Sequence, residues 1–269
     1  MFTILEREGS MFLGDKGKPN EYPMQRFNYD IIIDNERMTL HKLSTKLGFF
    51  SIIFDGRIRE VETIYDTDAN LMTGAGLLIR KKTSPKRTYF SLVRISSVAT
   101  GKDREKKSFL GECEPNDQPS DFPVQIADEI NNVFNNLFTI NLVDIVKHCK
   151  PYIRIEVGGN RYRIVSGTGY EVEMDFEDIL ARNAKNGKRA KTRVFSLKMS
   201  LDPKYEKERQ QIFDTIEKYC KELDLLERNR FEIAEVLTKD RVPKENPQAV
   251  EDAKKKGKKK DKNKKTEEE

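Results

Sequence analysis

The chain contains few residues of the types that build disulfide or zinc sites. In 269 residues it has three cysteines, Cys113, Cys149 and Cys220, and two histidines, His41 and His148. The cysteines are widely spaced and form no paired motif, which argues against a disulfide framework and against structural zinc. Because this cysteine usage is typical of a reducing compartment, we expect a cytoplasmic protein.

Long apolar runs are also missing. No stretch approaches the ~20 apolar residues that a membrane span needs. The N-terminal MFTILEREGS has neither the basic start nor the long apolar centre of a signal peptide. We therefore expect no membrane partner.

The net charge of +5 comes from one segment of the chain. Residues 254–269 contain nine lysines and four acidic residues, so the rest of the chain is close to neutral. The segment has no apolar periodicity and no interleaved aromatic residues, which predicts a disordered tail over 239–269. We expect no nucleic-acid partner, except through weak contacts of these lysines.

The chain is long enough for one large domain with a sizeable core, or for two small ones. Residues 1–24 are interrupted by glycine and proline and predict an irregular arm, and residues 25–238 predict the folded domain. Hydrophobic residues make up 36% and charged residues 35% of the chain. This is a low apolar content for a dense core, but it suits a barrel with a polar interior.

The pattern of apolar residues predicts both strands and helices along this domain. Helical spacing of apolar residues predicts three long helices, with a possible restart after the third, over 35–47, 122–137, 203–223 and 231–237. Period-two and turn signals predict strands over 26–34, 52–65, 77–82, 87–95, 109–114, 151–157, 161–165, 170–176 and 193–201. Asp55-Gly56 indicates a bulge or turn, and Gly158-Gly159 indicates a hairpin.

Polar and apolar side chains alternate along several of these strands. Glu171, Glu173 and Asp175 share one face of their strand, and Arg154 and Glu156 share one face of theirs. Alternation alone fits an open sheet whose charged face lies in water as well as a barrel whose charged face lies inside. The number of strands, about eight or nine, and the presence of both charge signs favour closure.

Residues 62–82, ETIYDTDANLMTGAGLLIRKK, carry a family resemblance. The features in order are Tyr65-Asp66-Thr67, Leu71, Gly76, and a strand that ends in Arg80 and Lys82. This order resembles the CYTH family, also called triphosphate tunnel metalloenzymes. The resemblance implies an α+β fold, a tunnel-like antiparallel β-barrel of about eight or nine strands with helices packed outside it.

The resemblance also implies a site. The basic residues at positions that would bind phosphate are Arg80, Lys82, Arg94, Lys150 and Arg154. The acidic residues at positions that would hold Mg²⁺ or Mn²⁺ are Glu112, Glu114, Glu173 and Asp175. Cations bind phosphate oxygens, and a metal held by carboxylates bridges those oxygens, so the partner implied is a triphosphate or nucleotide.

Two strands depart from the family pattern. The family's first strand carries Glu-x-Glu-x-Lys, where this chain has Arg26, Asn28 and Asp30. Its last strand usually carries Glu-x-Glu, where this chain has Ser196 and Lys198. Two functions therefore stay open. One is metal-dependent hydrolysis of a triphosphate, with nucleotide cyclisation less favoured; the other is a non-catalytic module that binds polyphosphate or nucleotide, or serves interactions.

Overall fold

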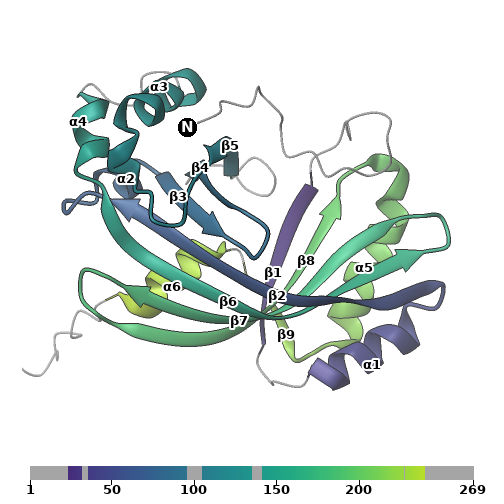
Figure 1. The fold of residues 1–269 in the computed structure, drawn as a ribbon. Helices are drawn as coiled ribbons and strands as arrows, with labels where there is room; N and C mark the ends of the chain where they lie inside the picture. Colours follow the sequence, from purple (N-terminus) through teal and green to yellow (C-terminus); the bar gives the residue numbers. More distant parts are fainter. Residues whose placement is uncertain (1–23, 32–35, 96–104, 135–140, 227, 240–269) are drawn as a thin grey trace, which may run out of the picture. The chain divides into compact units, whose positions relative to one another are not determined.

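The computed structural model describes residues 24–31, 36–95, 105–134, 141–226 and 228–239 (Figure 1). The predicted N-terminal arm, apart from Met24, and nearly all of the predicted Lys-rich tail lie outside these residues. Among the residues described, no helix combines the length and the apolar character needed to cross a membrane.

One nine-stranded antiparallel sheet forms the framework of the fold. Its strands are β1 (Met24–Ile31), β2 (Phe50–Asp66), β3 (Leu77–Thr83), β4 (Thr88–Ile95), β5 (Glu105–Glu112), β6 (Lys150–Ser166), β7 (Glu171–Asn183), β8 (Arg189–Ser200) and β9 (Leu223–Leu226). They lie in the order β5-β4-β3-β2-β6-β7-β8-β1-β9. The predicted antiparallel architecture and strand number are confirmed, although the described hydrogen-bond ladder stays open between β5 and β9.

Within the described residues, six α-helices and two short 3₁₀ turns accompany the sheet. They are α1 (Glu36–Lys46), α2 (Leu71–Gly74), η2 (Pro119–Asp121), α3 (Pro123–Phe134), α4 (Leu142–Lys147), η3 (Pro203–Tyr205), α5 (Glu206–Tyr219) and α6 (Arg230–Thr238). Asp202 starts the turn before α5 by accepting a hydrogen bond from the backbone N–H of Lys204 at 3.0 Å. The predicted restart of the last helix is confirmed as α6, and β9, which the sequence did not indicate, separates it from α5.

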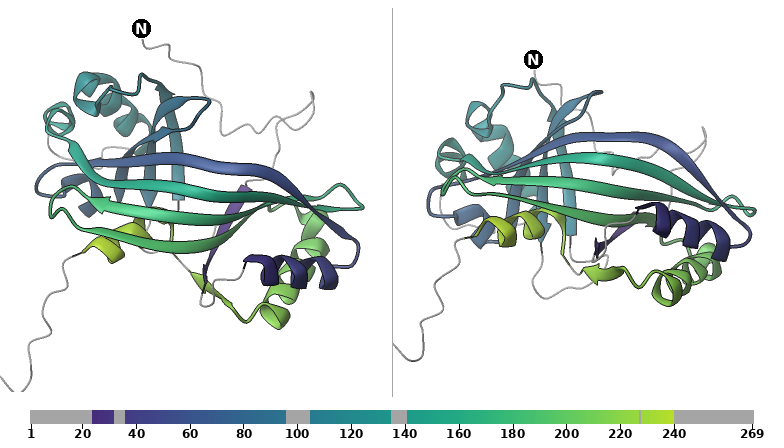
Figure 2. Two further views of the ribbon diagram at one scale, coloured as in Figure 1. Left: turned by 60° about the horizontal axis from the view of Figure 1, so that its bottom comes forward. Right: turned by 90° about the horizontal axis from the view of Figure 1, so that it is seen from below.

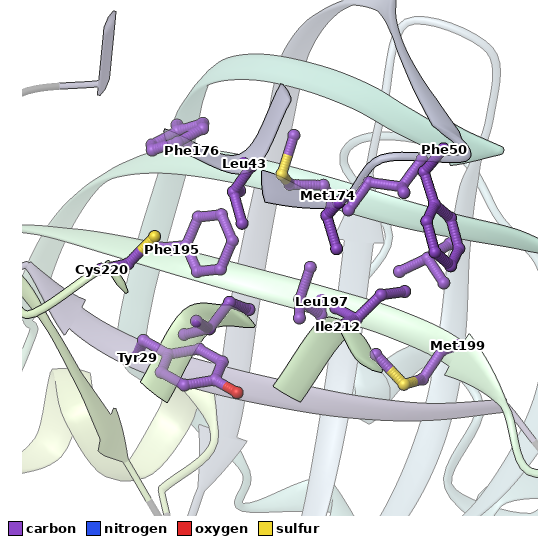
Figure 3. Packing of buried hydrophobic residues seen from close by; sticks show 14 of the residues in the cluster. Tyr29, Leu43, Phe50, Met174, Phe176, Phe195, Leu197, Met199, Ile212 and Cys220 are labelled. Atoms are coloured by element: carbon purple, nitrogen blue, oxygen red, sulfur yellow. The ribbon is translucent and has the colours of Figure 1, made fainter. Parts of the chain in front are cut away.

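Two apolar clusters cover what we call the outer face of the sheet. At one end, α1 and α5 lie side by side (Figure 2), and their Leu43 and Ile212 pack on Met174, Phe195 and Leu197 of the strands (Figure 3). At the other end, side chains of α2, α3 and α4 pack on β2, β3 and β4. This burial confirms the predicted apolar faces of 170–176 and 193–201.

The opposite, inner face of the sheet is covered by α6. Phe231 and Ala234 of this helix pack on Ile155, Ile179 and Val194 from three neighbouring strands. These side chains are buried and apolar, so the helix is part of the hydrophobic core. As a result, the apolar side of the first half of β6 faces inward.

A bulge in β2 decides which of its side chains face inward. The pairing of β2 with β6 shifts between Phe54 and Gly56, where the sequence predicts an irregularity. Phe54 packs on Tyr162 on the outer face, whereas Ile58 lies in the inner cluster. The extra residue thus reverses the alternation and turns Glu62 toward the inner face.

The hairpin predicted at Gly158-Gly159 is wrong, because β6 runs through both glycines without a turn. Gly159 has a φ of +130°, and a Cβ built on it would lie 1.9 Å from the carbonyl oxygen of Phe176. The glycine therefore serves a close approach of β6 to β7. A glycine pair inside one long strand gives the same sequence signal as a turn between two short ones.

Candidate functional site

Charged side chains gather on the inner face beside the apolar contacts of α6. We call this set the inner charge cluster, and its members are Arg26, Glu60, Glu62, Arg80, Lys82, Arg161, Glu173, Asp175, Glu177, Lys198 and Arg230. Strand alternation places the strand residues on this face. Some lie an even number of residues from another inward-facing residue of the same strand, and others lie directly opposite an inward-facing residue of the neighbouring strand. The members of the cluster come from β1, β2, β3, β6, β7, β8 and α6.

Arg230 occupies the centre of the cluster. Its Nη1 lies 2.6 Å from Glu62 Oε1 and 3.0 Å from Glu60 Oε2, and its Nε lies 2.9 Å from Glu177 Oε2. A second bond from Nη2 makes the contact with Glu177 bidentate. This single guanidinium therefore joins the carboxylates of β2 to that of β7.

The start of α6 fixes the position of Arg230. Asn229 accepts a hydrogen bond from the backbone N–H of Glu232, and Glu232 accepts one from the backbone N–H of Asn229, each at 2.9 Å. This reciprocal capping makes Arg230 the first residue of the helix. Phe231 then packs into the inner apolar cluster and holds the helix end against the sheet.

A second group of contacts surrounds Asp175. Arg161 donates to both of its carboxylate oxygens, at 2.8 and 3.0 Å, and also lies 3.2 Å from Glu173. Arg26 of β1 lies 3.7 Å from Asp175 and donates to Glu177. The two arginines thereby connect the carboxylates of β7 to β6 and β1.

The third group links β3 to β2. Lys82 Nζ lies 2.8 Å from Glu60 Oε2, and Arg80 Nη1 lies 3.7 Å from Glu62 Oε2. Arg80 also donates from Nε to the hydroxyl of Ser91 at 3.1 Å. Glu60 and Glu62 are consequently shared between the cations of β3 and Arg230.

Burial and neighbouring charges set the ionisation of the cluster. Burial opposes ionisation of Glu177, but Arg230 and Arg26 lower its pKa to about 2. Burial likewise opposes ionisation of Glu62, yet its cationic neighbours hold its pKa well below the ordinary range. Burial lowers the pKa of Lys198 to about 8; Glu173 opposes this shift, and Arg26 and Arg161 add to it.

Three cations of the cluster, Arg26, Lys82 and Arg161, are more exposed than the acids that they contact. The side chains of Arg26 and Arg161 are each 27% exposed, whereas those of Asp175 and Glu177 are 2% and 0% exposed. Lys82 is 21% exposed. Asp175 and Glu177 thus lie beneath Arg26 and Arg161, and the most exposed side chains of the cluster carry positive charge.

No protein-family model and no curated protein sequence matches the chain. Among solved structures, the fold matches HpAC1 from Hippeastrum, an adenylyl cyclase candidate described as having a dominant triphosphatase activity. The TM-score is 0.50 at 11% sequence identity, and the match covers 80% of this chain and 96% of that chain. The chain has the CYTH fold.

Two further structures also match. PH1819 from Pyrococcus horikoshii OT3 has a TM-score of 0.41 at 10% identity, over 78% of this chain and 97% of that one. An adenylate cyclase candidate from Vibrio parahaemolyticus has a TM-score of 0.37 at 13% identity, over 78% and 96%. A shared fold does not by itself show a shared function.

Four of the residues predicted from the CYTH resemblance meet in the inner charge cluster. They are Arg80, Lys82, Glu173 and Asp175. Each lies on the inner face of its strand and contacts another member of the cluster.

The other predicted site residues lie elsewhere. Lys150 is exposed and pairs with Asp68, and Arg154 is exposed and pairs with Glu156 on the outer face. Arg154 faces outward because Ile153 and Ile155, its neighbours in β6, pack inward against α6. Arg94 also lies outside the inner charge cluster, on the outer face with Phe90 and Leu92. Glu112, at the end of β5, and Glu114, just beyond it, are exposed.

The carboxylates present do not fit the metal site that the CYTH resemblance implies. Glu60, Glu62 and Glu177 hold Arg230, and Asp175 holds Arg161. Four strands separate β5, which carries Glu112, from β7 in the sheet order. Within the described ranges, no group of three or more His, Cys, Asp or Glu side chains could hold a metal ion.

Seven of the eleven cluster residues were not among the site residues predicted from the sequence. Glu60 and Glu62 show the alternation of an inward polar face, but the bulge at Gly56 hides which face that is. Arg161 follows the glycine pair that suggested a turn. Arg230 lies in a short helix, and only its position beside an apolar Phe-x-Ile-Ala stretch indicated that it would be near the core.

Proposed function

We propose that the protein binds the triphosphate group of inorganic triphosphate or of a nucleoside triphosphate at the exposed cations of the inner charge cluster. The observation that carries this proposal is the layering of charge, in which Arg26, Lys82 and Arg161 reach solvent above carboxylates that are almost fully buried. Phosphate oxygens accept charge-assisted hydrogen bonds from such groups. The CYTH fold, shared with a structure described as a triphosphatase, supports the choice of triphosphate.

Lys198 strengthens the anion preference. Arg26 and Arg161 both lower its pKa, which places three cations near one another on β1, β6 and β8. A polyanion entering there would relieve the repulsion among these cations and stabilise the charged form of Lys198. The gain comes from protein groups alone, so binding does not require a metal ion.

Metal-dependent hydrolysis is the less supported function. It needs a cation held by carboxylates close to the reacting phosphoryl group. The buried acids of the cluster are engaged by arginines. We therefore propose binding without turnover, as in the non-catalytic alternative.

The test is calorimetric titration of the full-length protein with inorganic triphosphate, first without metal and then with Mg²⁺ or Mn²⁺. Wild type should bind in the absence of metal. Lys82→Gln and Lys198→Gln should each weaken binding about tenfold or more, because a charge-assisted hydrogen bond contributes ~1.5–3 kcal/mol. Lys207→Gln, an exposed lysine of α5, is the matched control and should bind as wild type does.

Two results would contradict the proposal. One is the absence of binding at millimolar triphosphate, and the other is equal weakening in the control variant. Phosphate release from triphosphate or ATP is measured in parallel. Phosphate release that depends on Mg²⁺ or Mn²⁺ and is lost in Glu173→Gln would instead support metal-dependent hydrolysis of the triphosphate.

A further inference from the structure

Three arginines lie directly opposite one another on the outer face of the sheet. Arg154 of β6 pairs in register with Arg182 of β7, and Arg182 pairs with Arg189 of β8. Side chains that are directly opposite in an antiparallel ladder have Cβ atoms ~4.5–5.5 Å apart and point to the same face. We call these three residues the arginine row.

The arginine row has little compensating negative charge. Arg154 pairs with Glu156 at 3.1 Å. Within the described part of the chain, the structure gives no ion pair to Arg182, to Arg189 or to Lys191, which lies one rung along β8. Arg154, Arg189 and Lys191 are exposed and Arg182 is half-buried, so this stretch of the face is open to solvent.

The arginine row lowers the stability of the sheet and contributes no contact to the hydrophobic core. Like charges directly opposite each other destabilise a sheet. No apolar cluster includes the arginines, and their inward neighbours Ile155 and Ala181 already anchor the strands. An anionic partner bound at the row would neutralise these charges, and the relief of their repulsion would favour its binding.

We propose that the arginine row binds the phosphate backbone of a nucleic acid. Guanidinium groups match phosphate oxygens in bidentate geometry, and a nucleic acid offers the repeated phosphates that a row of cations on three adjacent strands can contact together. Contacts to phosphate oxygens carry no sequence information, so binding to the row is independent of base sequence.

A membrane surface fits less well. Surfaces that bind anionic lipids usually insert apolar side chains beside their cations. The rung that adjoins the row contains Glu156, Leu180 and Lys191, and its one apolar member is half-buried. The row therefore offers charge but no apolar anchor.

The test measures binding of a fluorescent duplex of about 20 base pairs to the full-length protein over a range of salt concentrations. The row variant is Arg154→Gln/Arg182→Gln/Arg189→Gln. Its control is Lys207→Gln/Lys218→Gln/Lys221→Gln, which removes the same charge from exposed positions on and just after α5. The row variant should raise Kd at least tenfold and reduce the slope of log K against log salt by about 2–3, since each phosphate contact contributes ~0.9.

Equal weakening in both triple variants would assign binding to overall charge and overturn the proposal. So would unchanged binding by the row variant, or binding to vesicles of anionic lipid without binding to the duplex. Thermal melting checks folding, and the single variant Arg189→Gln, at a strand end, should already show part of the loss. Inorganic triphosphate, at a concentration that saturates the inner charge cluster, should not displace the duplex. Failure of the arginine-row proposal can therefore be distinguished from failure of the proposed triphosphate binding.

Discussion

Arg230 on the inner face of the sheet and the arginine row on the outer face differ in how their positive charge is compensated. On the inner face, Arg230 is 9% exposed and contacts three carboxylates, whereas on the outer face Arg182 and Arg189 face each other without a described ion pair. Burial explains the difference. A buried charge must be paired because its desolvation is costly, while water screens an exposed one. Inner charges should therefore matter for folding, and outer charges should matter chiefly for what the surface binds.

The largest effect is expected from removing the central inner cation. Arg230→Met leaves Glu60, Glu62 and Glu177 buried without their shared partner, and should lower the free energy of unfolding by ~3–5 kcal/mol. Urea denaturation measures this. Arg182→Gln on the outer face serves as the control and should change it by less than ~1 kcal/mol. Similar losses in both variants would abolish the contrast between the faces.

A somewhat smaller effect is expected from the acidic partner. Glu177→Gln keeps the shape of the side chain but removes its charge, and should cost ~1.5–3 kcal/mol at neutral pH. The pKa of Glu177 is about 2 when folded and 4.5 ordinarily, so the unfolded chain binds its proton more readily. Its contribution is present above pH 4.5 and disappears as the pH falls toward 2. The difference between the wild-type and variant unfolding curves should shrink over this range, and a constant difference would contradict the assignment.

Removing the charge of Lys198 should stabilise the fold rather than destabilise it, and the change in stability between pH 8 and pH 10 should be ~2 kcal/mol. Its folded pKa of about 8 lies below the ordinary 10.5, so between these values the unfolded chain holds more protons. Stability of the wild type relative to Lys198→Gln should therefore rise as the pH increases from 8 to 10. Parallel stability curves for the two proteins would show that Lys198 titrates normally.

The smallest expected effect lies on the outer face. Arg182→Thr removes the middle of the arginine row and introduces a residue that suits strands. Relief of the cross-strand repulsion should raise the free energy of unfolding by ~0.2–1 kcal/mol. Loss of stability beyond ~1 kcal/mol would mean that the row has a partner within the chain.

The sequence predicted the architecture better than the site. Apolar periodicity located α1 and α5, and alternation identified the buried faces of β7 and β8, because these signals are local. Which face becomes the inner one depends on pairing between distant strands. The bulge at Gly56 and the docking of α6 decide it, and they send Arg154 outward while bringing Glu62 and Arg230 together.

Gly159 limits how the charged strands can be rearranged. If β7 slid by one residue against β6, Asp175 and Glu177 would turn to the outer face, and the buried pairing excludes that. A slide by two residues would keep every face correct, and alternation alone would permit it. In the observed register Gly159 lies opposite Glu177 with a φ of +130°, where a Cβ would lie 1.9 Å from the carbonyl oxygen of Phe176. Only a glycine at position 159 permits this close approach, so the observed register depends on a residue that the hydrophobic pattern does not specify.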